Sequence, residues 1–281
     1  MGLAETGPKT SQALSEETQG QPERRLALIV EYDGTKYAGF QIQLDQPTIQ
    51  GAIEQALTAF TGGRIRIRGA SRTDSGVHAT GQVVDFLTQA SYPVGTFARA
   101  LNYYLPPDIK VQAACQVALD FHSRINAASR IYRYRILNRT WPSPLSRYTQ
   151  HWVREELNTD SMLQAAQHLV GVHDFRPLAL SHPMEKSAVR QVMRWDVRRE
   201  QETIVIECEA NGFLKHQIRR ANALLVEVGK GKWPTSIVKD TLENRLPEGL
   251  VWPSLPARGL CLMQVTYLDF WDKVKATDET D

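Results

Sequence analysis

The residues best suited to chemistry lie in one short loop, residues 69–79. Asp74 is the only carboxylate in this loop, and Arg72 places a guanidinium two residues before it. Residues 69, 70, 71, 75 and 76 are small, so a substrate can approach the backbone. The strand-like runs 64–68 and 82–87 flank the loop, and loops held in this way often carry function. This setting suits a nucleophile. However, Asp, Ser and Gly are also ordinary turn residues, and on the loop alone the turn interpretation is favoured.

Composition indicates a protein of ordinary globular type. The 281 residues suit one large or two moderate domains, and a hydrophobic content of 42% is enough for packed cores. We find no run long enough to span a membrane and no secretory signal region, so we expect a cytoplasmic protein. The three cysteines lack a C-x-x-C spacing, which predicts reduced structural thiols and no metal site.

Basic residues are clustered, although the net charge is only +2. Concentrations of Lys and Arg favour binding to phosphate groups, whereas any one cluster is better explained as a solvated face of a strand or helix. Three clusters near the candidate motifs shift the interpretation towards nucleic acid. They comprise Arg64, Arg66 and Arg68; Arg124, Arg130, Arg133, Arg135 and Arg139; and Lys215, Arg219 and Arg220.

The first half of the chain predicts a β-α-β-β-α-β series around the loop. A near-continuous apolar run predicts a strand over 26–32, and Thr48 is placed to cap a helix that ends before Gly62. Strands are expected over 65–68, 82–87 and 109–117, and a second helix over 95–103. This order is that of one ferredoxin-like or RRM-like α+β unit.

The second half broadly repeats this order. We predict strands over 131–137, 189–198, 203–210 and 262–270, and helices over 159–170, 214–228 and 235–244. The fold class is therefore α+β, with two similar units whose sheets join side by side around a central basic cleft. We predict a disordered tail over 1–23, domains over 24–118 and 119–272, and an acidic tail over 273–281. Pro142 to Pro144 is a competing boundary.

The loop resembles the signature of the tRNA pseudouridine synthase A family, in which an Arg-Thr-Asp-x-Gly-Val-His run carries the catalytic aspartate. Further matches to this family recur in order along the chain, and together they span about residues 25 to 270. They lie at residues 31–35, 39–43, 101–102, 105–106, 121–124, 132–134, 171–175, 212–214 and 218–219.

This resemblance implies roles for four residues. Asp74 is the expected nucleophile, Arg219 its ion-pair partner, and Arg72 the residue that helps to displace the base. A carboxylate closed off from water needs such a cation to keep its charge. Tyr132 is expected to stack on the target uracil, and its hydroxyl is a candidate acceptor of the C5 proton. By strand alternation Tyr132 and Tyr134 share one face, which is more often core than active site.

Weaker expectations complete the candidate site. We expect Thr73, Lys215, Arg133 and Arg220 to bind substrate, and His78 to be a local hydrogen-bonding residue. Asp33, His173 and Asp174 are expected to shape loops around the cleft. The chain departs from the family pattern at Ser71, Ser75, Arg220 and Ala223, which puts substrate preference in doubt more than activity.

The function that follows is isomerisation of uridine to pseudouridine at positions 38, 39 and 40 of the tRNA anticodon stem-loop. The resemblance implies a homodimer, tRNA as partner and no cofactor or metal. The residues leave open whether Asp74 attacks C1′, adds to the ring or assists formation of a glycal. Two other functions compete: a non-catalytic tRNA-binding protein, and a hydrolase using Asp74 and His78 as an acid/base pair.

Overall fold

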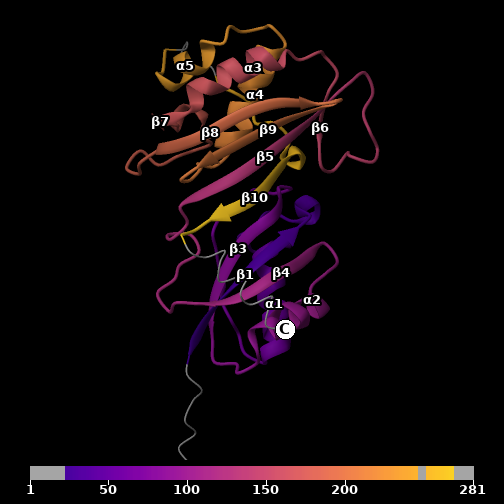
Figure 1. Cartoon of the computed structure of the whole chain (residues 1–281), viewed down its shortest axis with the longest axis vertical. Coiled ribbons are helices and arrows are strands. Elements are labelled where there is room, and N and C mark those ends of the chain that lie inside the picture. Colours follow the sequence, from indigo (N-terminus) through magenta and orange to yellow (C-terminus); the bar gives the residue numbers. More distant parts are fainter. Residues whose placement is uncertain (1–22, 246–250, 269–281) are drawn as a thin grey trace, which may run out of the picture.

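One long mixed β-sheet organises the part of the chain that the structure describes, residues 23–245 and 251–268 of a computed structural model (Figure 1). Its main strand order is β4-β1-β3-β10-β5-β9-β8-β7, while β2 pairs with β3 and β6 with β5. The strands are β1 (Arg24–Tyr32), β2 (Arg68–Gly69), β3 (His78–Thr88), β4 (Ile109–Val117), β5 (Ser129–Asn138), β6 (His151–Val153), β7 (Gly171–Asp174), β8 (Val189–Glu200), β9 (Thr203–Ala210) and β10 (Leu260–Thr266).

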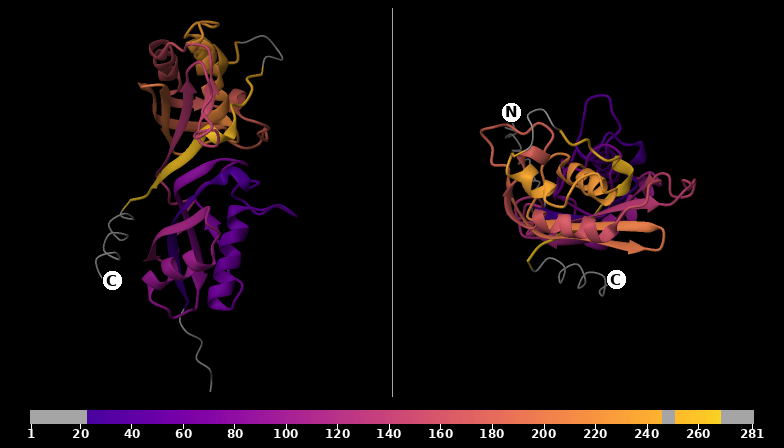
Figure 2. Two further views of the ribbon diagram at one scale, coloured as in Figure 1. Left: turned by 90° about the vertical axis from the view of Figure 1, so that its right-hand side faces the viewer. Right: turned by 90° about the horizontal axis from the view of Figure 1, so that it is seen from above.

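Two α+β halves lie end to end along this sheet, as Figures 1 and 2 show. The last strand, β10, joins them because it runs parallel to β3 of the first half and antiparallel to β5 of the second. The α+β class and the side-by-side arrangement are therefore confirmed, with the two sheets merged into one. The proposed domain boundary at residues 118 and 119 stays a prediction. Both predicted tails lie outside the described residues, apart from residue 23 of the first.

The helices follow the predicted amphipathic segments closely. Thr48 caps the first helix by accepting a hydrogen bond from the Gly51 amide, and Gly62 ends it in a left-handed conformation (φ +75°). Short 3-10 turns connect several elements. The helices are α1 (Ile49–Thr61), α2 (Val94–Tyr104), α3 (Thr159–Ala166), α4 (Gln217–Gly229) and α5 (Ile237–Leu242), and the turns are η1 (Gly34–Lys36), η2 (Gln167–Leu169), η3 (Arg176–Leu178) and η4 (Ala257–Gly259).

Helices of both halves and the 69–79 loop share one face of the sheet. On β3, Gln82 and Phe86 point the same way because strand side chains alternate. Phe86 packs against Phe97 of α2 at 6.0 Å between ring centroids, and Gln82 bonds to the loop at Ser71. On β8, Trp195 Nε1 donates to Asn222 of α4. Contacts from the loop to β5, described below, show that α2 and α4 cover the same face of the sheet. Figure 2 shows the helices of the second half stacked on the sheet.

A buried carboxylate anchors the segment that links the two halves. Asp85 is fully buried and accepts hydrogen bonds from Arg25 (2.6 Å), Arg68 and the Ser123 amide (2.9 Å). The two arginines also bond to linker carbonyls, at Leu119 and Phe121 respectively. Burial raises the pKa of Asp85, but its hydrogen bonds to Arg68, Ser123 and Arg25 outweigh it and leave the pKa below its usual value. The linker is thus fixed to the sheet by charge.

The strand predicted over residues 65–68 was wrong for most of its length. Only Arg68–Gly69 pairs with β3, as β2. The reason is local, since α1 side chains satisfy the backbone of Ile67. Its amide donates to Glu54 (3.2 Å), and its carbonyl accepts from Gln50 (3.3 Å). Alternating apolar residues therefore cover α1 here without forming a ladder.

Helix ends differ from prediction in the second half. The helix expected over 159–170 ends at Ala166 and continues as η2. Helix α4 starts three residues later than expected and includes Gly229, which was predicted to lie beyond its end. A Cβ on Gly229 would lie 2.7 Å from Met162 Sδ, so glycine allows α3 and α4 to pack closely. Strand β10 starts at Leu260, two residues before its predicted start, and ends at Thr266; Phe270, its predicted end, lies outside the described residues.

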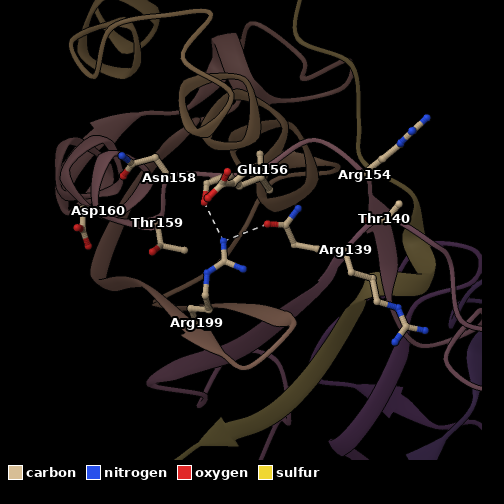
Figure 3. Close-up of a pocket in the computed structure, with 10 residues that line it drawn as sticks. Arg139, Thr140, Arg154, Glu156, Asn158, Thr159, Asp160 and Arg199 are labelled. Carbon is tan, nitrogen blue, oxygen red and sulfur yellow. Dashed lines mark hydrogen bonds between the residues drawn. The ribbon is translucent and has the colours of Figure 1, made fainter.

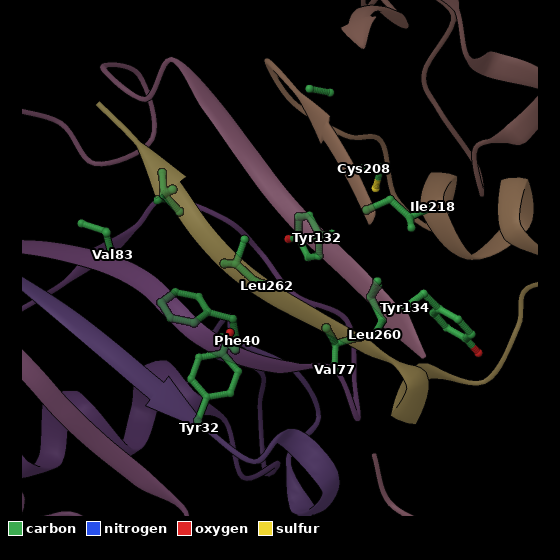
Figure 4. Packing of buried hydrophobic residues seen from close by; sticks show 14 of the residues in the cluster. Tyr32, Phe40, Val77, Val83, Tyr132, Tyr134, Cys208, Ile218, Leu260 and Leu262 are labelled. Atoms are coloured by element: carbon green, nitrogen blue, oxygen red, sulfur yellow. The ribbon is translucent and has the colours of Figure 1, made fainter. Parts of the chain in front are cut away.

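Apolar side chains fill the seam where β3, β10 and β5 meet (Figure 4). Phe40, Val77, Leu262 and Tyr134 are all buried here. Backbone pairing across β3 and β10 is short, with two residue pairs in register. Gly81 is required because a Cβ there would lie 2.3 Å from the Met263 carbonyl oxygen. Side-chain packing therefore holds the halves together more than the ladder does.

Candidate active site

Hydrogen bonds to neighbouring strands hold the start of the 69–79 loop. The Ala70 amide donates to Val83 (2.8 Å), and Gln82 bonds both the amide and the carbonyl of Ser71. Arg130 of β5 donates to the Ala70 carbonyl at 3.2 Å. The loop is therefore tied to both halves of the sheet before it reaches Asp74.

A second set of contacts holds the middle of the loop. Gly39 (φ +110°) approaches it so closely that a Cβ would lie 2.8 Å from the Thr73 carbonyl oxygen. The Phe40 amide donates to that same oxygen at 3.1 Å. Thr73 is buried, and its hydroxyl lies 2.8 Å from the Tyr32 hydroxyl. Thr73 was expected to bind substrate, but in the structure it holds the loop through its contacts with Phe40 and Tyr32.

His78 is a local structural residue, as predicted. Its Nδ1 accepts from the Gly34 amide (3.2 Å) and lies 3.1 Å from Asp33, and its Nε2 lies 2.8 Å from the Tyr148 carbonyl oxygen. Burial raises the pKa of Asp33, but hydrogen bonds from Thr35 and the proximity of His78 outweigh it and lower the pKa. Both ring nitrogens of His78 are engaged away from Asp74, so the acid/base pair required by a hydrolase does not form.

Asp74 meets Arg219 across the two halves of the molecule. Arg219 Nη1 lies 3.2 Å from Asp74 Oδ2, and the side chains are 13% and 21% exposed respectively. Arg219 projects from the first turn of α4, and its Nε donates to the Leu255 carbonyl at 2.6 Å. The guanidinium is thus fixed at one end while it faces the carboxylate at the other. The ion pair expected from the sequence is present.

His216 completes this cluster and was missed from the sequence. Its Nε2 lies 3.6 Å from Asp74 Oδ2 and 3.5 Å from Arg219 Nη1. Burial is the main cause that lowers the pKa of His216, and Arg219, Lys215 and Arg220 add to it against the opposing charge of Asp74. The signal that could have found it is its spacing, three residues before Arg219 at the start of a helix.

Tyr132 lies at the loop on the same face of the sheet. Its hydroxyl is 2.7 Å from Ser71 Oγ, and its ring meets Phe213 edge-on at 5.5 Å between centroids. Burial raises the pKa of Tyr132; the Ser71 hydrogen bond opposes this and the charge of Asp74 adds to it. Tyr134 shares the face, as predicted, but is core: its hydroxyl donates to the Pro256 carbonyl (2.8 Å). The phenol of Tyr132 therefore stays protonated near Asp74.

The remaining candidates are less closely associated with Asp74. Arg72 is exposed, and no hydrogen bond or ion pair links it to the rest of the described chain. Lys215 is also exposed, and Arg220 donates to the Ala179 carbonyl at 2.7 Å. Arg133 alternates with Tyr132 on β5, so it points to the opposite face, where it pairs with Glu207 at 2.8 Å.

Residues of the 171–175 motif lie in β7, in a strand and not in the expected loops. Asp174 pairs with Arg176 at 3.1 Å, and His173 Nε2 lies 2.9 Å from the Val170 carbonyl. All three cysteines are reduced thiols, as predicted; Cys115 and Cys208 are buried and Cys261 is half-buried.

Two hollows of about 500 Å³ lie elsewhere on the molecule. One, beside the start of α3, is lined by Arg139, Arg154 and Arg199 together with Glu156 and Asp160 (Figure 3). One guanidinium nitrogen of Arg199 donates to both the Asn138 side chain and the Leu157 carbonyl. The two carboxylates of this hollow offset the positive charge of its arginines. The other hollow includes Arg133 and Cys261. Asp74 lines neither of them.

The described residues hold neither a cluster suited to a metal ion nor a helix suited to a membrane. No group of three or more His, Cys, Asp or Glu there is arranged to hold a metal ion. No helix there has the length and apolar character needed to cross a membrane.

Comparison with known proteins points in one direction. The family model for tRNA pseudouridine synthase matches residues 28–126 and 165–268. The chain is 39% identical over 244 residues to tRNA pseudouridine synthase A of Geobacter sp. (strain M21), covering 87% of this chain and 99% of the relative. It is 43% identical over 246 residues to the protein of the same name from Caulobacter vibrioides (strain NA1000 / CB15N), with coverage of 87% and 99%.

Proposed function

Because the chain belongs to the tRNA pseudouridine synthase A family, we propose that it modifies uridines 38, 39 and 40 of tRNA with Asp74 as nucleophile. Family membership makes the chain an isomerase that converts uridine in tRNA to pseudouridine. The target positions and the catalytic residues are the parts that we propose. One observation supports the catalytic residues most, whereas the target positions rest on the family resemblance: the carboxylate of Asp74 faces Arg219 from the other half of the molecule, at 3.2 Å.

The reaction sets the demands on the site. The bond between C1′ of the ribose and N1 of uracil breaks, the base turns, and C5 forms the new bond to C1′. The proton on C5 is lost, and N1 gains one, so atoms and electrons balance without an oxidant. The site must therefore supply an anionic nucleophile and a surface that holds the freed base, while the C5 proton passes to the Tyr132 hydroxyl or to water.

Asp74 meets the first demand. Its side chain is 21% exposed, so a flipped nucleotide can reach it, and the contact with Arg219 at 3.2 Å orients the carboxylate. The carboxylate then attacks C1′, adds to the ring or assists departure of the base as a glycal forms. All three routes need the same ionised group in the same place.

Tyr132 meets the second demand. Its ring is fixed edge-on against Phe213 and by the Ser71 hydrogen bond and is 5% exposed in the free protein, so we propose that it meets the uracil once the flipped nucleotide enters the site. Stacking of a base on an aromatic ring is worth about 1 to 3 kcal/mol, which offsets much of the cost of flipping the nucleotide out. The side chain of Arg72 is exposed and can enter the space that the base leaves. Lys215 and Arg220 are close to Arg219 in the sequence, where they can contact phosphates of the tRNA.

We further propose that the protein acts in the cytoplasm as a homodimer, with tRNA spanning both subunits. Family resemblance supports this arrangement. Light scattering of the purified protein, alone and with tRNA, measures it directly. A monomeric protein that forms a one-to-one complex with tRNA and is fully active would contradict the dimer proposal.

Tritium release from tRNA labelled at uridine C5 tests the proposed site. We expect release by the wild type and none by Asp74→Asn, with tRNA affinity unchanged. Asp160→Asn, at an exposed position in the first turn of α3, is the matched control and should behave as wild type. Transcripts carrying cytidine at position 38, 39 or 40 locate the targets. Full release by Asp74→Asn would exclude Asp74 as nucleophile, and release of free uracil by the wild type would indicate hydrolysis.

A further inference from the structure

Three consecutive residues, Ser254 to Pro256, bond to three side chains: His216 and Arg219, which contact Asp74, and the core residue Tyr134. Ser254 Oγ lies 2.8 Å from His216 Nδ1, and the Leu255 carbonyl accepts from Arg219 Nε at 2.6 Å. The Pro256 carbonyl accepts from the Tyr134 hydroxyl at 2.8 Å. The Leu255 amide also donates to the Arg219 carbonyl at 3.2 Å. This segment, residues 254–256, therefore holds both residues that contact Asp74, namely His216 and Arg219.

His216 has an unusual backbone conformation at this point. Its φ is +61°, in the left-handed region, at the cap position of α4. Non-glycine residues take this conformation in only a few per cent of cases, although histidine tolerates it better than most. Such conformations gather at functional sites, where surrounding contacts maintain them. Here the conformation directs the imidazole towards Asp74, with its ring held at the other nitrogen by Ser254.

We propose that His216, held by Ser254, is a positioning residue that fixes the Asp74–Arg219 pair in its reactive geometry. This inference rests on the proposed role of Asp74. The neutral imidazole contacts the pair in either tautomer: Nε2–H donates towards Asp74 Oδ2 (3.6 Å), or bare Nε2 accepts from Arg219 Nη1 (3.5 Å). In apo enzymes such contacts are often long and tighten when substrate binds.

Charge explains why the neutral form matters. The groups that face His216 are one anion, Asp74, and three cations, Arg219, Lys215 and Arg220. An imidazolium would compete with Arg219 for the same carboxylate oxygen and repel its guanidinium. The lowered pKa of His216 keeps the ring neutral at physiological pH. Acid should therefore disturb the pair below the ordinary histidine value of about 6.5.

Single-turnover tritium release with saturating enzyme tests this proposal. His216→Asn retains a residue that tolerates positive φ, but its shorter amide does not reach Asp74. We expect its rate to fall about 10- to 100-fold, as for a misplaced catalytic group, with tRNA affinity within about twofold of wild type. The wild-type rate should show an ionisation below about pH 6.5 that is absent in the variant. His168→Asn, on η2, is the control and should match wild type.

Ser254→Ala provides a second variant that leaves the α4 backbone unchanged. It should slow the single-turnover rate in the same direction by a smaller factor, and it decides the matter if His216→Asn does not fold. A wild-type rate for both variants, or a defect confined to tRNA affinity, overturns the proposal. Asp74→Ala in the same assay separates the two ideas. If it is active, the proposed function fails; if it is inactive while His216→Asn is normal, only the role of His216 fails.

Discussion

Replacing Arg219 by alanine is the sharpest test of the catalytic pair. The change removes the contact to Asp74 (3.2 Å) and the hydrogen bond to Leu255 (2.6 Å), from a side chain that is 13% exposed. Two unit charges about 4 Å apart interact by about 4 kcal/mol at an effective dielectric constant near 20. Water and His216 replace part of this interaction, so we expect a loss of about 2 to 4 kcal/mol. That corresponds to a fall of about 30- to 1000-fold in rate.

The assay is single-turnover tritium release, with tRNA affinity measured separately by filter binding. Because Arg219 points at Asp74 and Leu255, tRNA affinity should change little. Arg219→Lys keeps the charge but loses the bond to the Leu255 carbonyl, so its rate should lie between those of wild type and Arg219→Ala. Arg198→Ala, at the end of β8, removes an exposed ion pair with Glu200 and serves as control. A normal rate for Arg219→Ala would refute the pairing argument.

Substitutions at three further residues test the supports of the site. Tyr132→Phe keeps the stacking ring and loses the bond to Ser71, so its single-turnover rate should stay within about tenfold of wild type, whereas Tyr132→Ala should lose about 1 to 3 kcal/mol of stacking. Asp85→Asn leaves two arginines without their anion, and urea unfolding should show a loss of about 3 kcal/mol. Since the pKa of Asp85 is lowered, its stabilisation is present above the ordinary value of about 3.9 and fades as pH falls below it, a dependence that the variant should lack. Gly39→Ala should disturb the loop at Thr73 and lower the rate; a fully active variant with an unchanged melting temperature would contradict the close approach.

Much of the fold followed from local signals in the sequence. The apolar run of β1, the Thr48 cap and the Gly62 stop each depend on neighbours within a few residues, so they were predicted correctly. The strand predicted here did not form over 64–67 because the backbone bonds to side chains of α1, and the alternation of apolar and polar residues does not reveal this. The prediction that Gly229 lies beyond the end of α4 was wrong for a similar reason, since α3 packs against this glycine from about 65 residues away in the sequence.

In the candidate site too, residues marked by local motifs were predicted and residues that act through long-range contacts were not. The loop around Asp74 and the helix carrying Arg219 are marked by motifs, and their pairing was expected from family resemblance. His216 lies in the same helix turn but stands in no motif that assigns it a role. Ser254 and Leu255 act through one hydroxyl and one carbonyl, and a carbonyl is common to every residue. Contacts made by the backbone leave no trace in residue type.

The proposed catalytic pair lies across a seam that few backbone hydrogen bonds hold together. Strands β3 and β10 share two residue pairs, yet Asp74 and Arg219 come from opposite sides of that seam. What aligns them is a set of side-chain contacts across it, from Arg130 to the Ala70 carbonyl and from Tyr132 to Ser71. Because an error of about 1 Å in a catalytic group can cost about 100-fold in rate, loosening this seam should slow turnover before it unfolds either half. The packing between the halves is therefore part of the active site that we propose.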